Sequence, residues 1–335
     1  MSQRVTITDV AQAAGVSVAT VSKVINSRYG VAAATTAKVQ SVIDDLGYES
    51  SLIARSMRSH RTHVIGILVA EFEPFSTEIL KGAGNALAET NYELLAYTGA
   101  RQSGGAGWEQ RYLSRLSGSL IDGALIVTPT VVTTKSSVPV VAIDPHEGPL
   151  GPYTVDSDNL TGAYQATKHL IDLGHRRISF LGGRSDLASS ALREGGYRNA
   201  LAEAGIEVDE ALIRSGDYSR DHSLAPVREI LSLPDRPTAL FAANDLSAIG
   251  AMETAINMGL NIPADLSIVG FDNIPESTRT TPPLTTIHQP IQEMGARGIS
   301  MLVDLIEGKD VSEKHVRLPT SLIVRGSTAP APKLD

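Results

Sequence analysis

Residues 5 to 26 carry two short runs in which apolar positions recur at helical spacing with small polar residues between them. Thr6 stands where it can cap the first run, and Ser17 stands where its side chain can accept a hydrogen bond from the amide of Thr20 at the start of the second. Gly15 separates the runs, and glycine reaches positive φ without a steric penalty. The apolar positions expected to pack the two helices together are Val10, Ala11, Ala14, Val16, Val21 and Val24. The pattern predicts a helix-turn-helix.

The second predicted helix has an outward face made of small or slender side chains. These are Val18, Ala19, Ser22 and Lys23, which would let the helix enter the major groove of DNA. An ordinary helical hairpin is the alternative interpretation, but the N-terminal location and a third helix predicted over residues 33 to 46 favour a DNA reader. Because Val18 and Ala19 offer bases no side-chain hydrogen bonds, we expect Lys23 and methyl contacts to carry most of the direct readout.

From residue 63 onward, short apolar runs alternate with longer amphipathic runs. The apolar runs predict strands at His63 to Ala70, Tyr92 to Tyr97, Gly123 to Val127, Val138 to Ile143, Arg177 to Leu181, Ala239 to Ala243 and Ser267 to Phe271. The amphipathic runs predict helices at Ser76 to Glu89, Trp108 to Leu116, Leu160 to Leu173, Ser190 to Ala204, Ser223 to Leu231, Asp245 to Met258 and Ile291 to Ile306. This alternation is typical of parallel sheets covered by helices on both faces.

The motif Thr-x-x-Asp-Val-Ala-x-x-Ala-Gly-Val-Ser-x-x-Thr-Val-Ser-Lys-Val-x-Asn, from Thr6 to Asn26, resembles that of the lac repressor/gal repressor (LacI/GalR) family of bacterial transcription regulators. The resemblance runs from about Val5 to about Arg325. It implies an α/β fold with an N-terminal helix-turn-helix headpiece and a periplasmic-binding-protein-like core of two doubly wound parallel-sheet lobes, between which the chain crosses near Asn159, Gln289 and Pro319. The implied domains are a headpiece at 1–50, a hinge helix at 51–61, an N-lobe at 62–159 plus 290–325, a C-lobe at 160–289 and a flexible tail at 326–335.

The resemblance also implies DNA contacts. In the family, positions matching Val18, Ala19 and Lys23 meet base edges, and those matching Thr6, Ser17, Thr20, Ser22 and Asn26 mostly hold phosphates. The segment matching Ser51 to Arg58 folds into a helix on DNA and wedges an apolar side chain into the minor groove. Here that wedge is Met57, with Arg55 as a further DNA contact.

Three positions depart from the family pattern. Met57 stands where leucine is usual, Ser50 stands where proline is usual, and Ala32 stands where the third helix often has a capping serine. Methionine is more flexible than leucine, and a chain without the proline has more freedom to lose on ordering. We therefore expect a headpiece that becomes ordered mainly when DNA is present.

Polar residues follow several predicted strands, and ligands in doubly wound folds bind at the carboxyl ends of strands. Carboxylates, amides and arginine can hydrogen-bond to vicinal hydroxyls, and aromatic faces can stack on sugar rings, so the sequence predicts a carbohydrate site. The resemblance places the effector contacts at Asp144, Arg193, Tyr218, Asn244 and Asp272, with Phe75 as an apolar wall. The many carboxylates favour an uncharged mono- or oligosaccharide over a sugar phosphate.

Each of these positions has a structural alternative. Asn244 and Asp245 could be helix caps, and Asp272 could cap a turn. Arg193 could form a surface ion pair, although the two glycines that follow it favour ligand contact. Tyr218 and Phe75 could pack at a lobe edge. Trp108, the only tryptophan, could be a lid over the cleft or a helix-packing residue.

Charge divides the chain in the same way as the domains. Residues 1–61 hold seven Lys and Arg against four Asp and Glu, about +3, which leaves 22 against 33, or −11, for the remainder. A basic head on an acidic body directs phosphate contact to one end. The chain has no cysteine, which excludes disulfides and thiolate metal sites. Without an apolar leader or a run long enough to span a membrane, we expect a cytoplasmic protein.

The function expected is that of a DNA-binding repressor released by a small carbohydrate. The alternative is a regulator whose ligand or protein partner strengthens DNA binding. A headpiece this small contacts one half-site, so we expect a homodimer on a pseudo-palindromic operator. No protease, nucleotide-binding or nucleophile motif is present, so we expect neither an enzyme nor a cofactor or metal.

Overall fold

The computed structural model describes residues 5–25, 29–48, 61–99, 107–117, 120–130, 136–146 and 153–332. The chain divides into two compact units, a headpiece unit within Met1–Thr62 and a core unit within His63–Asp335. Asn26, Arg55 and Met57 lie outside the described residues, so their expected DNA contacts stay predictions, and Ser50 lies outside them as well.

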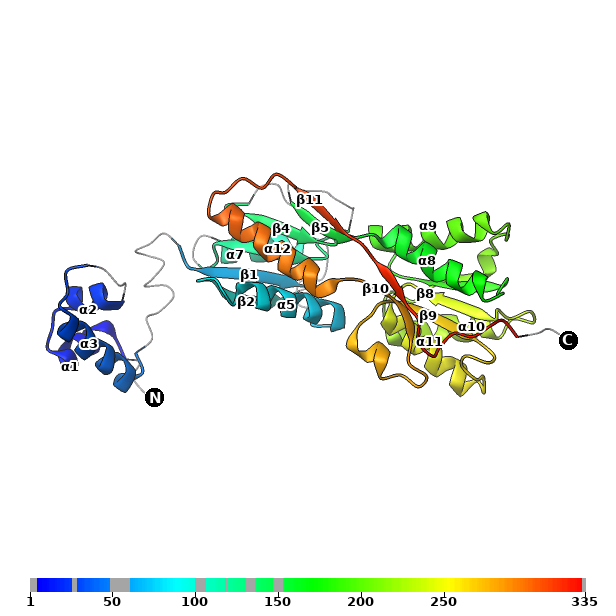
Figure 1. Ribbon diagram of the computed structural model, residues 1–335, viewed down its shortest axis with the longest axis horizontal. Helices are drawn as coiled ribbons and strands as arrows, with labels where there is room; N and C mark the ends of the chain where they lie inside the picture. The colour runs from blue at the N-terminus through cyan, green and yellow to red at the C-terminus, as the bar shows by residue number, and fades with distance from the viewer. Residues whose placement is uncertain are drawn as a thin grey trace. The chain divides into compact units, whose positions relative to one another are not determined.

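The headpiece unit is built from three helices around one small apolar core. The helices are α1 (Ile7–Ala14), α2 (Val18–Ile25) and α3 (Ala33–Leu46) (Figure 1). Five of the six residues predicted to pack α1 on α2 are buried, and the sixth, Val16, is partly buried against them. Val39 of α3 completes the cluster. α1 ends at Gly15, whose φ of 64° is the left-handed conformation expected there. The helix-turn-helix prediction is therefore confirmed.

The first lobe of the core is a six-stranded parallel sheet in the order β11-β5-β4-β3-β1-β2. Its strands are β1 (Val64–Val69), β2 (Glu93–Thr98), β3 (Gly123–Val127), β4 (Val140–Ile143), β5 (Thr154–Ser157) and β11 (His315–Leu318). Helices α5 (Pro74–Leu87) and α12 (Ile291–Ile306) cover one face, and α7 (Trp108–Leu116) covers the other.

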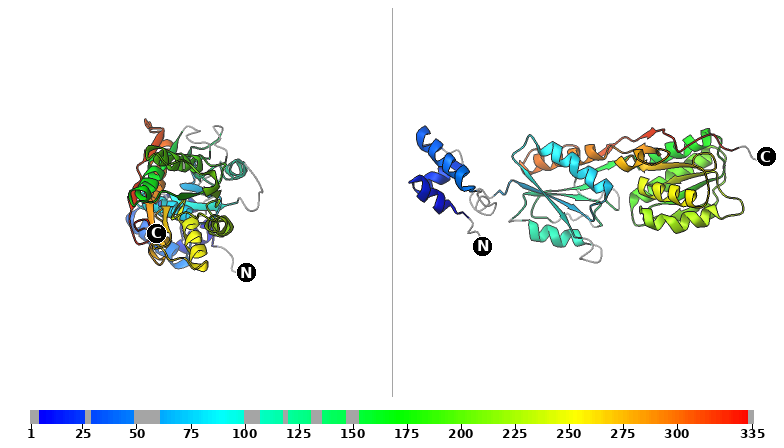
Figure 2. Two further views of the ribbon diagram at one scale, coloured as in Figure 1. Left: turned by 90° about the vertical axis from the view of Figure 1, so that its right-hand side faces the viewer. Right: turned by 90° about the horizontal axis from the view of Figure 1, so that it is seen from below.

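The second lobe also has a six-stranded sheet, in the order β12-β10-β9-β8-β6-β7, in which β12 is antiparallel to β10 and the other pairs are parallel. Its strands are β6 (Ile178–Gly182), β7 (Ile213–Ser215), β8 (Ala239–Ala242), β9 (Ser267–Asp272), β10 (Thr285–His288) and β12 (Ser321–Ile323). Helices α8 (Asn159–Asp172) and α9 (Ala188–Glu203) pack on one face. Helices α10 (Arg220–Leu231) and α11 (Asp245–Asn257) pack on the other, so each lobe is a sheet between two helical layers (Figure 2).

Three segments carry the chain between the lobes. The first lies between β5 and α8, the second between β10 and α12, and the third between β11 and β12 (Figure 1). The first and third are tied together, because the amide of Asp158 donates to the carbonyl of Leu318 at 2.9 Å and the Thr320 hydroxyl donates to the carbonyl of Asp158 at 3.0 Å.

The C-terminal end corrects two expectations. The N-lobe was expected to extend to residue 325 and a flexible tail to follow it, but β12 pairs antiparallel with β10 in the second sheet. Beyond it, Ser327 is fully buried, accepts from the amide of Thr285 at 2.8 Å and donates to the carbonyl of Ile268 at 2.6 Å. Residues 321–332 therefore belong to the second lobe, because they satisfy backbone groups at the edge of that lobe.

Trp108 is a packing residue rather than a lid. It is 3% exposed, lies against Tyr112 with ring centroids 6.0 Å apart, and joins the apolar cluster beneath α7. Within the described part of the chain, no helix is both long enough and apolar enough to span a membrane.

Candidate functional site

The first candidate site is the outward face of α2 in the headpiece unit. Thr6 caps α1 in a capping box, with its hydroxyl accepting from the amide of Asp9 at 3.4 Å while Asp9 accepts from the Thr6 amide at 2.7 Å. Ser17 accepts from the amide of Thr20 at 3.1 Å, as predicted, and the two hydroxyls lie 2.9 Å apart. Local side-chain chemistry thus sets where both helices begin.

α2 buries one side and presents the other. Val21 and Val24 are buried in the headpiece core, whereas Val18 is 41% exposed and both Ala19 and Lys23 are exposed. Ser22 and Thr20 are partly buried at the margin of that face. The residues expected to meet bases therefore lie together on the free side of the second helix. α3 starts at Ala32 without a side-chain cap, as expected from alanine.

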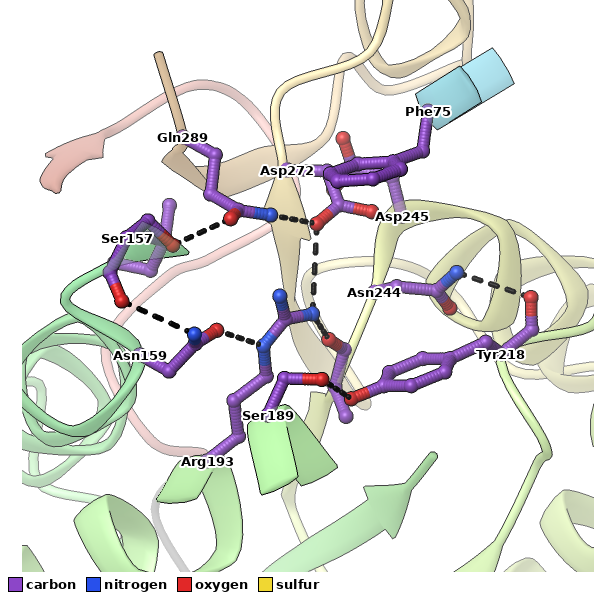
Figure 3. Close-up of polar contacts among 12 residues, drawn as sticks. Phe75, Ser157, Asn159, Ser189, Arg193, Tyr218, Asn244, Asp245, Asp272 and Gln289 are labelled. Carbon is purple, nitrogen blue, oxygen red and sulfur yellow. Dashed lines mark hydrogen bonds and ion pairs between the residues drawn. The ribbon is translucent and has the colours of Figure 1, made fainter. Parts of the chain in front are cut away.

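The second candidate site lies at the carboxyl ends of the core strands. Arg193 comes from α9, Tyr218 from the turn before α10, Asn244 from the end of β8 and Asp272 from the end of β9. Figure 3 shows these four side chains gathered in one place; we call them the polar cluster. They are separated by up to 79 positions in the sequence, and the fold brings them together.

Arg193 lies at the centre of the polar cluster. It is 3% exposed, its Nε donates to Oδ1 of Asn159 at 2.8 Å, and its Nη1 donates to the carbonyl of Ala243. The same nitrogen lies 3.4 Å from Oδ1 of Asp272. The guanidinium stacks over the ring of Phe271 at 3.8 Å from its centroid. A surface ion pair, one alternative for this arginine, is therefore excluded.

Tyr218 and Asn244 lie on one side of the polar cluster and contact each other. The guanidinium of Arg193 lies 5.4 Å from the centroid of the Tyr218 ring. Asn244 caps α11 by accepting from the amide of Ser247 at 2.9 Å, and its Nδ2 donates to the carbonyl of Tyr218 at 3.0 Å (Figure 3). Asn244 is thus a helix cap that also holds the turn carrying Tyr218.

Asp245 is not a cap. It is fully buried, and it accepts from the Thr286 hydroxyl at 2.5 Å and from the amide of Ile274 at 2.9 Å. These contacts tie the start of α11 to β10 and to the loop after β9. Its role in the structure is to anchor the loop that follows Asp272.

Two predicted residues approach from the first lobe. Phe75, in the first turn of α5, is partly buried against the first-lobe core and lies beside Asp272 and Asp245 in Figure 3. Asp144 follows β4, is 8% exposed, and interacts with the charge of Arg193 and the side chain of Ser189. The cluster is therefore faced by residues of both lobes.

The lobes also touch directly near Asp144. The carbonyl of His146 accepts from the amide of Ala188 at 2.7 Å, and Nδ1 of the His146 ring lies 3.4 Å from Oδ2 of Asp186. These contacts join the end of β4 to the start of α9.

Burial shifts the acidity of the site. Desolvation raises the pKa of Asp144 to about 6 and that of Asp272 to about 7, although Arg193 acts in the opposite direction on both. Burial also raises the pKa of Asp245 and of Glu73, which caps α5. Burial thus favours the neutral, hydrogen-bonding form of all four carboxyls, and Asp144 and Asp272 are the two whose charge interacts with Arg193.

Backbone strain collects at the same place. Of the seven non-glycine residues with positive φ in the described chain, five are Asp144, Asp217, Tyr218, Asp272 and Asn273. Such conformations cost free energy and are concentrated at ligand sites in proteins. The backbone therefore leaves the extended conformation at these strand ends, as is typical of positions whose side chains contact a ligand.

Sequence reasoning missed Asn159 and Gln289, which contact the polar cluster, and Ser157, which contacts Gln289. Asn159 and Gln289 were identified only as crossing points between the lobes. Their proximity to those crossings was the available signal, but which side chains they would meet depends on the packing of the lobes.

Comparison with known proteins identifies relatives of both the headpiece and the core. Residues 6–51 match the model of "Bacterial regulatory proteins, lacI family", and residues 167–328 match the model of a periplasmic binding protein-like domain. The chain is 35% identical over 332 residues to the HTH-type transcriptional repressor PurR of Photobacterium profundum, an alignment that covers 96% of this chain and 98% of that protein. It is 35% identical over 335 residues to the ribose operon repressor of Escherichia coli, covering 96% and 99%.

Solved structures agree along nearly the whole chain. A lac repressor dimer bound to operator and the anti-inducer ONPF superposes with a TM-score of 0.86 at 26% identity, covering 98% of this chain and 100% of that one. A complex of the transcriptional regulator CelR with cellobiose superposes with a TM-score of 0.72 at 34% identity, covering 97% and 100%. Members of this family are DNA-binding transcriptional repressors with a ligand-binding core, and they act as dimers. The chain belongs to the lacI family of bacterial regulatory proteins.

Proposed function

We propose that this regulator represses sugar-utilisation genes and that a small neutral carbohydrate, bound at the polar cluster between the core lobes, releases it from its operator. The observation that carries the proposal is the buried Arg193, held between Asp272 and two aromatic rings and close to the buried carboxyl of Asp144. Arginine donors, carboxyl acceptors and flat aromatic faces together match the hydroxyls and apolar faces of a sugar ring.

The charge of the site argues for an uncharged effector. Asp144 and Asp272 already interact with the buried Arg193, so the phosphate of a phosphorylated sugar would have to compete with both side chains for that cation. Two similar proteins are described with sugars in their names, a ribose operon repressor and a CelR complex with cellobiose. The effector contacts proposed are Phe75, Asp144, Arg193, Tyr218, Asn244 and Asp272.

The DNA side of the proposal rests on the free face of α2. Lys23, with the methyl groups of Val18 and Ala19, reads base edges, while Thr6, Ser17, Thr20, Ser22 and Asn26 hold phosphates. Residues 1–50 form this headpiece and residues 51–61 a hinge that places Arg55 and Met57 on the DNA. Two copies of the chain then occupy a pseudo-palindromic operator. The protein acts in the cytoplasm and has no enzymatic activity.

Operator release tests the proposal. An operator is selected by the full chain from a pool of pseudo-palindromic DNA, labelled, and titrated by fluorescence anisotropy with D-ribose, cellobiose and ribose 5-phosphate. We expect a neutral sugar to weaken binding, whereas tighter binding would identify a co-repressor and a response to the phosphate alone would refute the charge argument. Arg193→Met should abolish the response and keep operator binding. Arg198→Met, on the same helix but in surface ion pairs with Glu194 and Glu210, is the matched control.

A further inference from the structure

Five buried residues form a closed ring of hydrogen bonds that includes Arg193 and Asp272 of the polar cluster (Figure 3). The Ser157 hydroxyl donates to Oε1 of Gln289, and Nε2 of Gln289 donates to Oδ1 of Asp272 at 2.7 Å. Arg193 donates to the same Asp272 oxygen at 3.4 Å and to Oδ1 of Asn159 at 2.8 Å. Nδ2 of Asn159 donates to the carbonyl of Ser157 at 3.1 Å, which returns the ring to its start.

The ring joins Arg193 and Asp272, two of the proposed effector contacts, to the segments that connect the lobes. Ser157 and Asn159 flank the first crossing, and Gln289 lies in the second. All five members are at most 5% exposed, so water is not available to replace a broken contact. Each side-chain amide is used at both ends, so neither crossing can shift without disturbing Arg193 or Asp272.

One contact in the ring is longer than the rest. The 3.4 Å separation of Arg193 and Asp272 exceeds the distances of 2.7, 2.8 and 3.1 Å given above for other contacts in the ring. It is the place where a ligand hydroxyl can insert, by accepting from the guanidinium and donating to the carboxylate. A ligand bound there would replace a direct contact in the ring with a bridged one.

We propose that Asn159 and Gln289 are positioning residues, which hold Arg193 and Asp272 for the effector and, through the closed ring, make the geometry of the first two lobe crossings depend on whether the effector is bound. The proposal rests on the proposed function for the role of the effector, but the ring itself is testable without a ligand. Asn159 and Gln289 share no direct hydrogen bond, so the ring predicts an energetic coupling between them that separate pairs would not produce.

A double-mutant cycle tests that coupling in the full-length protein. Asn159→Ala, Gln289→Met and the double variant are unfolded in urea, and the unfolding equilibrium constants are compared with the wild type. Because the first replacement already opens the ring, the second should add less. We expect the double variant's fold-change to fall short of the product of the single fold-changes by about threefold or more.

A control cycle separates a ring from general proximity. Asn159→Ala is combined with Asn244→Ala, since Asn244 belongs to the polar cluster but bonds only outside the ring. Multiplicative fold-changes in the Asn159 and Gln289 cycle would overturn the proposal, as would equal coupling in both cycles. If Asn159→Ala does not fold, Asn159→Ser, which keeps a small polar side chain but lacks the amide that links Arg193 to Ser157, takes its place in both cycles.

The regulatory consequence is tested with D-ribose and cellobiose as probes. For coupled sites, the ratio of operator Kd values with and without a saturating ligand is typically about 5- to 150-fold, or about 1 to 3 kcal/mol. In Ser157→Ala this ratio should fall towards one. Calorimetry should show that the variant still binds the sugar. Ser179→Ala, another fully buried serine whose hydroxyl donates to a backbone carbonyl, should keep the wild-type ratio. An unchanged ratio in Ser157→Ala refutes the coupling. A wild type that binds neither sugar refutes the proposed effector class, and the ring is then judged by the urea cycle alone.

Discussion

Two glycines in α5 should respond in opposite directions to the same substitution. A Cβ built on Gly82 would lie 1.8 Å from the carbonyl oxygen and 2.5 Å from the carbonyl carbon of Gln292, in the first turn of α12. A Cβ on Gly84 meets nothing within 4 Å. The obstacle at Gly82 is backbone rather than a flexible side chain, so α5 and α12 must move apart to admit a methyl group.

The magnitudes follow from these distances. Overpacking of this kind costs about 1 to 3 kcal/mol, and contact with backbone places Gly82→Ala near the upper end. Replacing glycine by alanine within a helix itself contributes about 0.5 to 1 kcal/mol of stability. We therefore expect Gly82→Ala to destabilise the first lobe by about 2 kcal/mol and Gly84→Ala to stabilise it by about 0.5 to 1 kcal/mol.

The chain supplies its own probe for this experiment. Trp108 is the only tryptophan and is buried in the first lobe, so its fluorescence follows the unfolding of that lobe in urea. Because Phe75 lies at the start of α5, Gly82→Ala should also weaken the sugar response, and Gly84→Ala should not. Two variants that shift the urea midpoint in the same direction would refute the close helix contact.

Three further outcomes are expected. Burial raises the pKa of Asp144 to about 6 and that of Asp272 to about 7, from 3.8, so the folded state binds these protons more tightly than the unfolded state. The free energy of unfolding should therefore fall as pH rises from about 4 to about 7. Urea midpoints followed by circular dichroism should show this fall, and Asp144→Asn should make it smaller. Gly183→Ala would place a Cβ 2.1 Å from Cζ of Tyr218 and so displace that ring. In anisotropy titrations, the sugar should then no longer release the operator, while the operator affinity without sugar is kept. Lys23→Ala should weaken operator binding and relax sequence preference, and uniform binding across operator variants by the wild type would contradict its role in base readout.

Much of the fold could be predicted from local pattern. The predicted strand at Gly123 to Val127 and the predicted helices at Trp108 to Leu116 and Ile291 to Ile306 have the observed bounds. These runs are either continuously apolar or strongly amphipathic, so the sequence alone indicates their type and length. The headpiece was equally legible, because its caps and its glycine turn act within three or four residues of one another.

The elements that were missed share a different character. β5, β7, β10, β11 and β12 are only three or four residues long, and most of them carry several polar residues. A run such as Thr285–His288 becomes a strand because β9 and β12 lie on either side of it. Its hydrogen-bonding partners are set by topology, so no local propensity identifies it.

The sequence by itself determined the headpiece, the alternation of strands and helices, and the polar strand ends that would form a ligand site, because these depend on spacing along the chain. Tertiary structure decided that Arg193 is buried rather than on the surface, that Asp245 anchors the loop after Asp272, and that residues 321–332 belong to the second lobe. It also decided the ring that joins Asn159 to Gln289, residues 130 positions apart. The physical reason is that buried polar groups must find hydrogen-bond partners, and which partners are within reach is known only once the lobes have packed.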